Sequence, residues 1–175
     1  EPSSIVDLTG RPRDHEAWHG NPAWDKKASH KITDCPGARA YIKRWDGDRI
    51  VFNMQHRARA GVIHDLPDFA ATTDFIIVNP HLKENASPNK RWPWDKWQEL
   101  VNNLPLPVIQ IGSPDANRLK GVDYIETRNI REACAVIKAS KYLITHEGGM
   151  HHMAASMNKL AVVIFGAFCP PEVLG

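Results

Sequence analysis

The sequence has few cysteines, little net charge and no long apolar run. Its three cysteines, Cys35, Cys134 and Cys169, are far apart and include no Cys-x-x-Cys pair, which argues against a zinc site and against a disulfide framework. The formal net charge of +2 offers no broad basic surface for nucleic acid. The longest apolar run, Leu160–Phe165, is far shorter than the roughly 20 residues of a membrane-spanning helix. These shortages predict a globular protein of a reducing cytoplasm that binds no nucleic acid.

The first part of the chain lacks a regular hydrophobic period. Residues 1–73 are rich in Pro, Gly, Asp, Arg and His. Two extended runs, Ala40–Lys43 and Arg49–Phe52, flank an Asp-Gly pair that is typical of a β-hairpin. We therefore expect 1–73 to be an irregular linker or extension with a short hairpin. Because the chain starts at Glu1 and stops in a turn-like run, we also expect it to be a fragment or a processed product.

From residue 74 onward, short apolar runs alternate with amphipathic helical spacing. The predicted strands are 75–78, 108–111, 123–125, 141–145 and 161–165, and the predicted helices are 94–103, 130–139 and 150–157. Pro93 suits the first turn of one helix, and Asn129 is a plausible N-cap of another. This alternation predicts an α/β fold over 74–175, a Rossmann-like parallel sheet with helices on both faces.

The most specific motif follows a predicted strand and opens a helix. Ligands of parallel sheets bind beyond the carboxyl ends of the strands, and the run Glu147–His152 lies at such an end. A helix start has unpaired N–H groups and a partial positive charge, and two glycines there let a phosphate approach the backbone. His152 is placed to donate to a phosphate oxygen, and Glu147 to accept from a sugar or ribose hydroxyl. The competing interpretation is a tight turn with surface histidines.

Two further strand-end loops contain charged candidates. Lys90 and Arg91 lie just before a helix start, where a cation gains nothing from the helix dipole unless an anionic ligand is present. Asp115 follows the second predicted strand and is a candidate to accept from ribose hydroxyls. A solvated loop and a structural turn are the competing interpretations. The histidines within 146–152 lack the spacing of known zinc motifs, so we expect no metal ion and no cofactor.

In this order, the three motifs resemble the donor-binding domain of glycosyltransferase family nine, the ADP-heptose:lipopolysaccharide heptosyltransferases, which have the two-domain GT-B architecture. The resemblance covers roughly residues 74–175. The family's motif runs Asp-Thr-Gly, two variable residues, His, Leu and Ala-Ala. Glu147 stands where the family has Asp, Gly148 replaces the Thr, and Gly149 and His152 match the Gly and the His. The family's Lys-x-Trp-Pro corresponds to Lys90–Pro93.

The resemblance implies a function and a set of site residues. The donor-binding residues that it implies are Lys90, Asp115, Glu147, Gly148, Gly149, Met150 and His152. The implied reaction is metal-independent transfer of a sugar, with inversion, from a nucleoside-diphosphate sugar to a hydroxyl of a glycan or lipid-linked acceptor, in synthesis of bacterial surface glycan or lipopolysaccharide. The family places the catalytic base on the N-terminal acceptor domain. We expect this chain to lack that domain, so no catalytic residue is nominated.

Other functions stay open on the sequence. The chain could be a non-catalytic module that binds a sugar nucleotide, or part of a sugar-nucleotide epimerase, because such epimerases share the GT-B architecture. For location, the cytoplasm is expected, and peripheral attachment at the inner membrane is the alternative.

Overall fold

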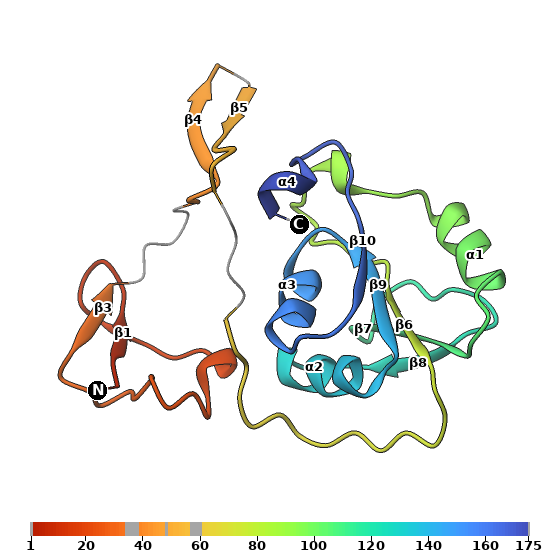
Figure 1. The fold of residues 1–175 in the computed structure, drawn as a ribbon, viewed down its shortest axis with the longest axis horizontal. Coiled ribbons are helices and arrows are strands. Elements are labelled where there is room, and N and C mark those ends of the chain that lie inside the picture. Colours follow the sequence, from red (N-terminus) through yellow and green to blue (C-terminus); the bar gives the residue numbers. More distant parts are fainter. Residues whose placement is uncertain (1, 34–38, 48, 57–60, 175) are drawn as a thin grey trace.

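The computed structural model describes residues 2–33, 39–47, 49–56 and 61–174. Its centre is a five-stranded sheet with the order β10-β9-β6-β7-β8, in which every pairing is parallel (Figure 1). The strands are β6 (Ile76–Asn79), β7 (Val108–Gly112), β8 (Asp123–Glu126), β9 (Tyr142–His146) and β10 (Ala161–Ile164). The predicted α/β, Rossmann-like fold is confirmed.

Helices cover both faces of this sheet because successive strand residues point in opposite directions. Ile76 and Val78 of β6 pack on one face in a buried cluster with Trp97, which lies on α1 (Trp94–Asn102). Ile77, between them, packs on the other face with Val136, which lies on α2 (Ile130–Ala139). The helix α3 (Gly149–Ser156) joins this second layer through its buried Ala154.

The strand order reverses beside β6, the central strand. From β6 the chain adds β7 and β8 on one side, and then returns to place β9 and β10 on the other side. The loops after β6 and β9 therefore leave the sheet in opposite directions, which opens a crevice between them. The sequence predicted that a ligand binds at the carboxyl ends of the strands. The strand order indicates that, of these five ends, those of β6 and β9 border the crevice.

The N-cap of α2 is formed as the sequence predicted. The side chain of Asn129 accepts a hydrogen bond from the backbone N–H of Glu132, at 2.9 Å. Glu132 reaches back to accept from the backbone N–H of Arg128, at 2.8 Å. These two bonds satisfy N–H groups that have no partner within the helix. Pro93 lies just before α1 rather than inside its first turn.

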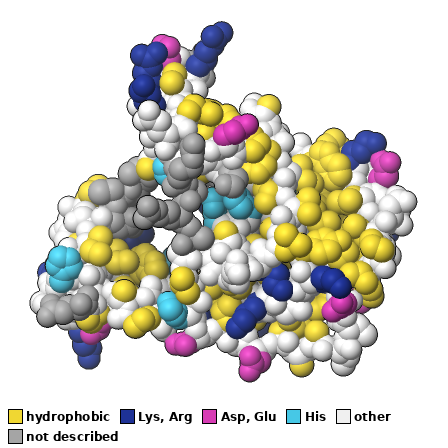
Figure 2. All heavy atoms as spheres, in the orientation of Figure 1, with side chains coloured by type: hydrophobic (Ala, Val, Ile, Leu, Met, Phe, Trp, Pro, Cys, Tyr) yellow, Lys and Arg dark blue, Asp and Glu magenta, His cyan; other side chains and the backbone are white. Residues whose placement is uncertain are grey.

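The N-terminal segment contains more regular structure than the sequence indicated. A small sheet has the order β2-β1-β3, with β1 (Ser4–Val6), β2 (Pro12–Arg13) and β3 (Lys31–Thr33), and the 3-10 helix η1 is Glu16–Trp18. Next, β4 (Ile42–Asp46) and β5 (Arg49–Phe52) pair antiparallel where the Asp-Gly pair predicted a hairpin. Figure 2 shows Lys and Arg side chains at the far end of this projecting hairpin. The boundary at residue 73 stays a prediction.

One arginine ties two stretches of the N-terminal segment to α2. The guanidinium of Arg131 donates to four backbone carbonyls, those of Glu16, His19, His64 and Asp65. The Glu16 side chain in turn accepts from the backbone N–H of Ile130, at 2.8 Å. A carboxylate at the amino end of a helix is electrostatically favourable. The segment is therefore fixed against the first turn of α2.

Within the described ranges, no helix is long and apolar enough to cross a membrane. Cys134 and Cys169 are buried and free. Cys35 lies outside the described residues.

Candidate functional site

A cavity of about 760 Å³ opens at the crevice between the ends of β6 and β9. We call it the strand-end cavity. Its walls come from the loop after β6, which includes the 3-10 helix η2 (Pro88–Lys90), from the turn between β9 and α3, and from the N-terminal segment. The predicted site residues that line it are Lys90, Glu147, Gly148, Gly149 and Met150. The structure thus brings together five of the seven, from two separate parts of the chain.

Lys90 and Glu147 form a buried ion pair inside this cavity. The Lys90 Nζ lies 2.9 Å from Oε1 and 2.7 Å from Oε2 of Glu147. The side chains are only 17% and 5% exposed, respectively. The same Nζ lies 4.4 Å from the centre of the Phe168 ring, a cation–π distance. The carboxylate and the ring therefore hold the ammonium group beside the turn that leads into α3.

The two glycines at the start of α3 face open space. A Cβ built on Gly148 or on Gly149 would meet no heavy atom within 4 Å. Gly148 occupies the N-cap position, and no side chain caps the helix. Neighbouring atoms therefore do not require glycine at either position, although the φ of +159° at Gly148 is one that other residues rarely adopt. They leave the amino end of α3 accessible from the cavity, and such an end favours anions.

His146 anchors the loop that contains Lys90. Its Nε2 accepts a hydrogen bond from the backbone N–H of Trp92, at 3.1 Å, and its ring lies edge-on to Trp97. The side chain is almost fully buried, and burial, helped by nearby His81, lowers its pKa to about 4. His146 is thus a neutral acceptor at pH 7. The sequence analysis missed this role; it predicted a strand over 141–145, whereas β9 includes His146 as its last residue.

Gly166, after β10, allows the Lys90 loop to approach. A Cβ at Gly166 would overlap the carbonyl oxygen of Asn89 and would lie 2.9 Å from the Cα of Lys90. Both contacts are with backbone, so no side-chain rotation relieves them. The close packing of this loop on the end of β10 therefore requires glycine.

We expect Gly166→Ala to destabilise the fold by about 1–3 kcal/mol, the usual effect of overpacking a tight contact. The denaturation midpoint in urea measures this change. Gly61→Ala is the matched control, because a Cβ at Gly61 meets nothing within 4 Å. Equal stability of the two variants would contradict the proposed close contact.

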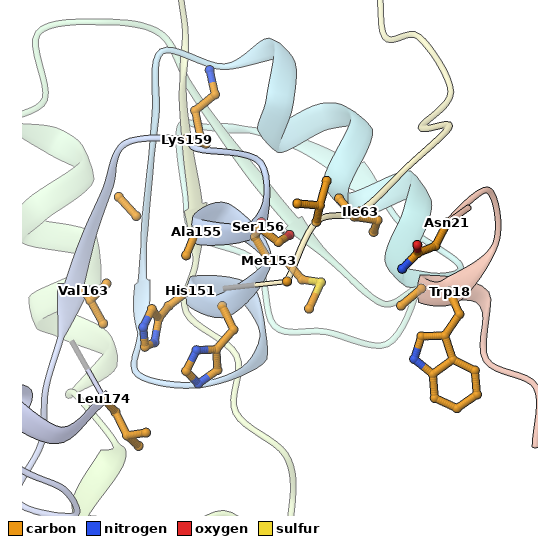
Figure 3. A pocket seen from close by; sticks show the side chains of 15 residues that line it. Trp18, Asn21, Ile63, His151, Met153, Ala155, Ser156, Lys159, Val163 and Leu174 are labelled. Atoms are coloured by element: carbon orange, nitrogen blue, oxygen red, sulfur yellow. Dashed lines mark hydrogen bonds between the residues drawn. The ribbon is translucent and has the colours of Figure 1, made fainter. Parts of the chain in front are cut away.

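Two predicted residues lie away from the strand-end cavity. Asp115 is exposed in the loop after β7 and does not line this cavity. His152 lines a second cavity of about 620 Å³, between α3, β10 and the N-terminal segment (Figure 3). Its ring lies 4.1 Å from that of His151, and burial lowers the pKa of both imidazoles. The phosphate-binding role of His152 and the ribose-binding role of Asp115 stay predictions.

No cluster of three or more His, Cys, Asp or Glu side chains able to hold a metal ion occurs in the described part of the chain. The strand-end cavity instead contains cationic groups and helix N–H groups. Both are chemically suited to an anionic ligand.

Comparison of the sequence with known proteins finds relatives that share one name. No family model matches the sequence. The chain is 23% identical over 128 residues to lipopolysaccharide heptosyltransferase 1 of Salmonella typhimurium, covering 62% of this chain and 40% of that protein. The protein of the same name from Escherichia coli K12 gives the same identity and coverage. The chain is therefore heptosyltransferase-like in sequence, as its motifs predicted, and it spans about 40% of the length of these relatives.

Among solved structures, the chain is similar to a glycosyl transferase family 9 protein from Veillonella parvula. The TM-score is 0.47 at 19% identity, over 61% of this chain and 34% of that chain.

Proposed function

We propose that this chain is the donor-binding part of a glycosyltransferase, and that the strand-end cavity holds the diphosphate of a nucleoside-diphosphate sugar. The observation that carries the proposal is Lys90 held beside the open amino end of α3, at the point where the strand order reverses. Dinucleotides and related phosphates bind at such points in other parallel sheets. The similarity to heptosyltransferase 1 supports the same assignment.

In the proposed reaction, the sugar passes to an acceptor hydroxyl with inversion, and a nucleoside diphosphate leaves. Negative charge grows on the leaving phosphate as the glycosidic bond breaks. The N–H groups at the start of α3 and the ammonium of Lys90 would stabilise that charge, which is the role that a metal ion has in other enzymes. Preorganised donors of this kind require no metal. The acceptor is a glycan or a lipid-linked saccharide.

The ion pair explains how Lys90 can contact Glu147 and a phosphate oxygen at the same time. An ammonium group has three N–H donors, and Glu147 engages it through both carboxylate oxygens. The carboxylate fixes the ammonium position, and the remaining N–H can donate to a phosphate oxygen. Glu147, which also lines the cavity, would in addition accept from a donor hydroxyl.

Thermal denaturation with a panel of nucleoside diphosphates tests the proposal. ADP, UDP, GDP, CDP and dTDP are each added to the chain, with the matching nucleosides as controls. At a concentration one hundred times its dissociation constant, a bound ligand stabilises by about 2.7 kcal/mol, which is a readily measured shift. We expect at least one diphosphate to raise the melting temperature and its nucleoside to have a much smaller effect. The absence of any shift would refute the proposal.

A binding module without catalysis is the second candidate. In the described lining of the strand-end cavity, Glu147 is the only carboxylate, and Lys90 engages it, so it is poorly placed to act as a general base. Product analysis with the complete protein separates the candidates. Sugar on an acceptor supports a transferase, an epimerised donor supports an epimerase, and an unchanged donor supports a binding module.

A further inference from the structure

The N-terminal segment supplies part of the strand-end cavity. Arg39 and Tyr41, which lie just before the hairpin, line the same cavity as Lys90 and the glycines at the start of α3. These two residues belong to the region that the sequence analysis described as an irregular extension. They place a second cationic side chain at the site where a diphosphate is proposed to bind.

Aromatic packing holds this wall in place. The Tyr41 ring stacks on Phe52 of β5 at 6.5 Å, and Phe52 meets the edge of Phe168 at 6.4 Å. These rings pack against the buried cluster of Cys169, Val173 and Leu174, in the segment that contains the C-terminal helix α4 (Pro171–Leu174). Because Phe168 also contacts the ammonium of Lys90, the base of the hairpin and the lysine both pack against this one ring.

Backbone hydrogen bonds fix the chain at Arg39 itself. The backbone N–H of Ile42 donates to the carbonyl of Arg39 at 2.8 Å, and the N–H of Asn53 donates to the carbonyl of Tyr41 at 2.7 Å. The hairpin therefore defines the position of the Arg39 backbone, and the residue as a whole is exposed. In the described part of the chain, the guanidinium has no ion pair or side-chain hydrogen bond, so it is available to a ligand.

The charges around the cavity favour a role for Arg39 in binding phosphate. Lys90 is already neutralised by the buried carboxylate of Glu147, so this pair alone adds little net positive charge. A diphosphate needs further positive charge, and a guanidinium can bind two phosphate oxygens at once. Lys83, in the loop after β6, also lines the cavity and is exposed like Arg39, but its ammonium lacks the two parallel donors of a guanidinium. Arg39 reaches the cavity from the N-terminal segment.

We propose that Arg39 is a second phosphate-binding residue, supplied by the N-terminal segment, and that the base of the β4–β5 hairpin is a wall of the donor site. This inference rests on the proposed function, because it assigns a further contact to the same diphosphate. It assigns a binding role to a segment that lies outside the region of family resemblance.

Isothermal titration with inorganic pyrophosphate and with the best nucleoside diphosphate from the panel tests this proposal. We expect Arg39→Ala to weaken binding of both probes roughly ten- to a hundredfold, as for a lost charge-assisted hydrogen bond. Arg39→Lys should retain part of the affinity because it keeps the charge. Arg49→Ala is the matched control, since Arg49 is exposed on the same hairpin and does not line the cavity.

The outcomes separate the two proposals. Wild-type affinity in Arg39→Ala, in a protein that binds the diphosphate and loses it on removal of Lys90, would overturn the role of Arg39 and leave the proposed function intact. An equal loss in Arg39→Ala and Arg49→Ala would also overturn it, because it indicates a general charge effect. Failure of the wild-type chain to bind either probe would instead overturn the proposed function. The unliganded melting temperature should be the same in both alanine variants.

Discussion

Replacement of Lys90 by methionine is expected to destabilise the fold by about 3 kcal/mol and to abolish diphosphate binding. The stability loss arises because Glu147, whose side chain is 5% exposed, keeps a buried carboxylate without its counter-charge. The binding loss arises because the ammonium beside α3 disappears. Urea denaturation at pH 7 measures the first effect, and titration with a nucleoside diphosphate measures the second.

A double variant separates these two effects. Lys90→Met combined with Glu147→Gln removes the unpaired buried charge, so most of the lost stability should return. Diphosphate binding should stay weaker than in the wild-type chain, because the ammonium N–H that donates to the phosphate is still missing. If the double variant is as unstable as the single one, the ion pair does not explain the stability loss. If either variant binds the diphosphate with wild-type affinity, Lys90 is not part of the site.

Acidification is expected to remove about 3 kcal/mol of stability through His146. Burial lowers the pKa of this imidazole from 6.5 to about 4 in the folded protein. As the pH falls below 6.5, the unfolded chain takes up the proton first, which favours unfolding. The contribution of His146 is therefore complete above pH 6.5 and is lost progressively down to pH 4. Each pKa unit corresponds to about 1.4 kcal/mol, which gives the expected size.

Urea denaturation between pH 7.5 and pH 4 measures this loss, and His146→Gln tests its origin. A glutamine amide oxygen can accept from the backbone N–H of Trp92 but does not titrate. The variant should be less sensitive to acid than the wild-type chain by about 3 kcal/mol at pH 4. His81, His151 and His152 also have lowered pKa values and give a background slope common to both proteins. His30→Gln, at an exposed position, is the control. An unchanged slope in His146→Gln would assign the acid sensitivity to other groups.

The strands of the central sheet could be predicted because each is a short apolar run between helical segments. Their order could not, because it depends on which strand pairs with which, and a run such as Ile76–Asn79 contains no record of its neighbours. For the same reason, the sequence placed Lys90 and Glu147 at one edge of the sheet but did not predict that they form an ion pair with each other.

The direction of His152 could not be predicted because α3 is short and its residues are small or apolar on most sides. Its rotation is set by the packing of Ala154, and of the flanking Met150 and Met157, against the sheet. This packing places His152 at the second cavity and leaves Gly148 and Gly149 at the first.

The N-terminal segment was harder to predict because its contacts are with distant residues. The Asp-Gly pair indicated a hairpin from local chemistry alone. Docking of Phe52 against Phe168 joins positions more than a hundred residues apart in the sequence, and no local pattern indicates it. The strands β1 to β3 contain two or three residues each, too few for a hydrophobic period to be visible.

The hydrogen bonds from Arg131 to the carbonyls of residues 16, 19, 64 and 65 have a practical consequence for any attempt to shorten this protein. A recombinant version that begins at residue 74 would retain the whole parallel sheet. It would also leave the Arg131 guanidinium without its four carbonyl acceptors, uncover the first turn of α2, and remove one wall of the strand-end cavity. The shortest useful version therefore keeps the leading segment, even though the sheet does not need it.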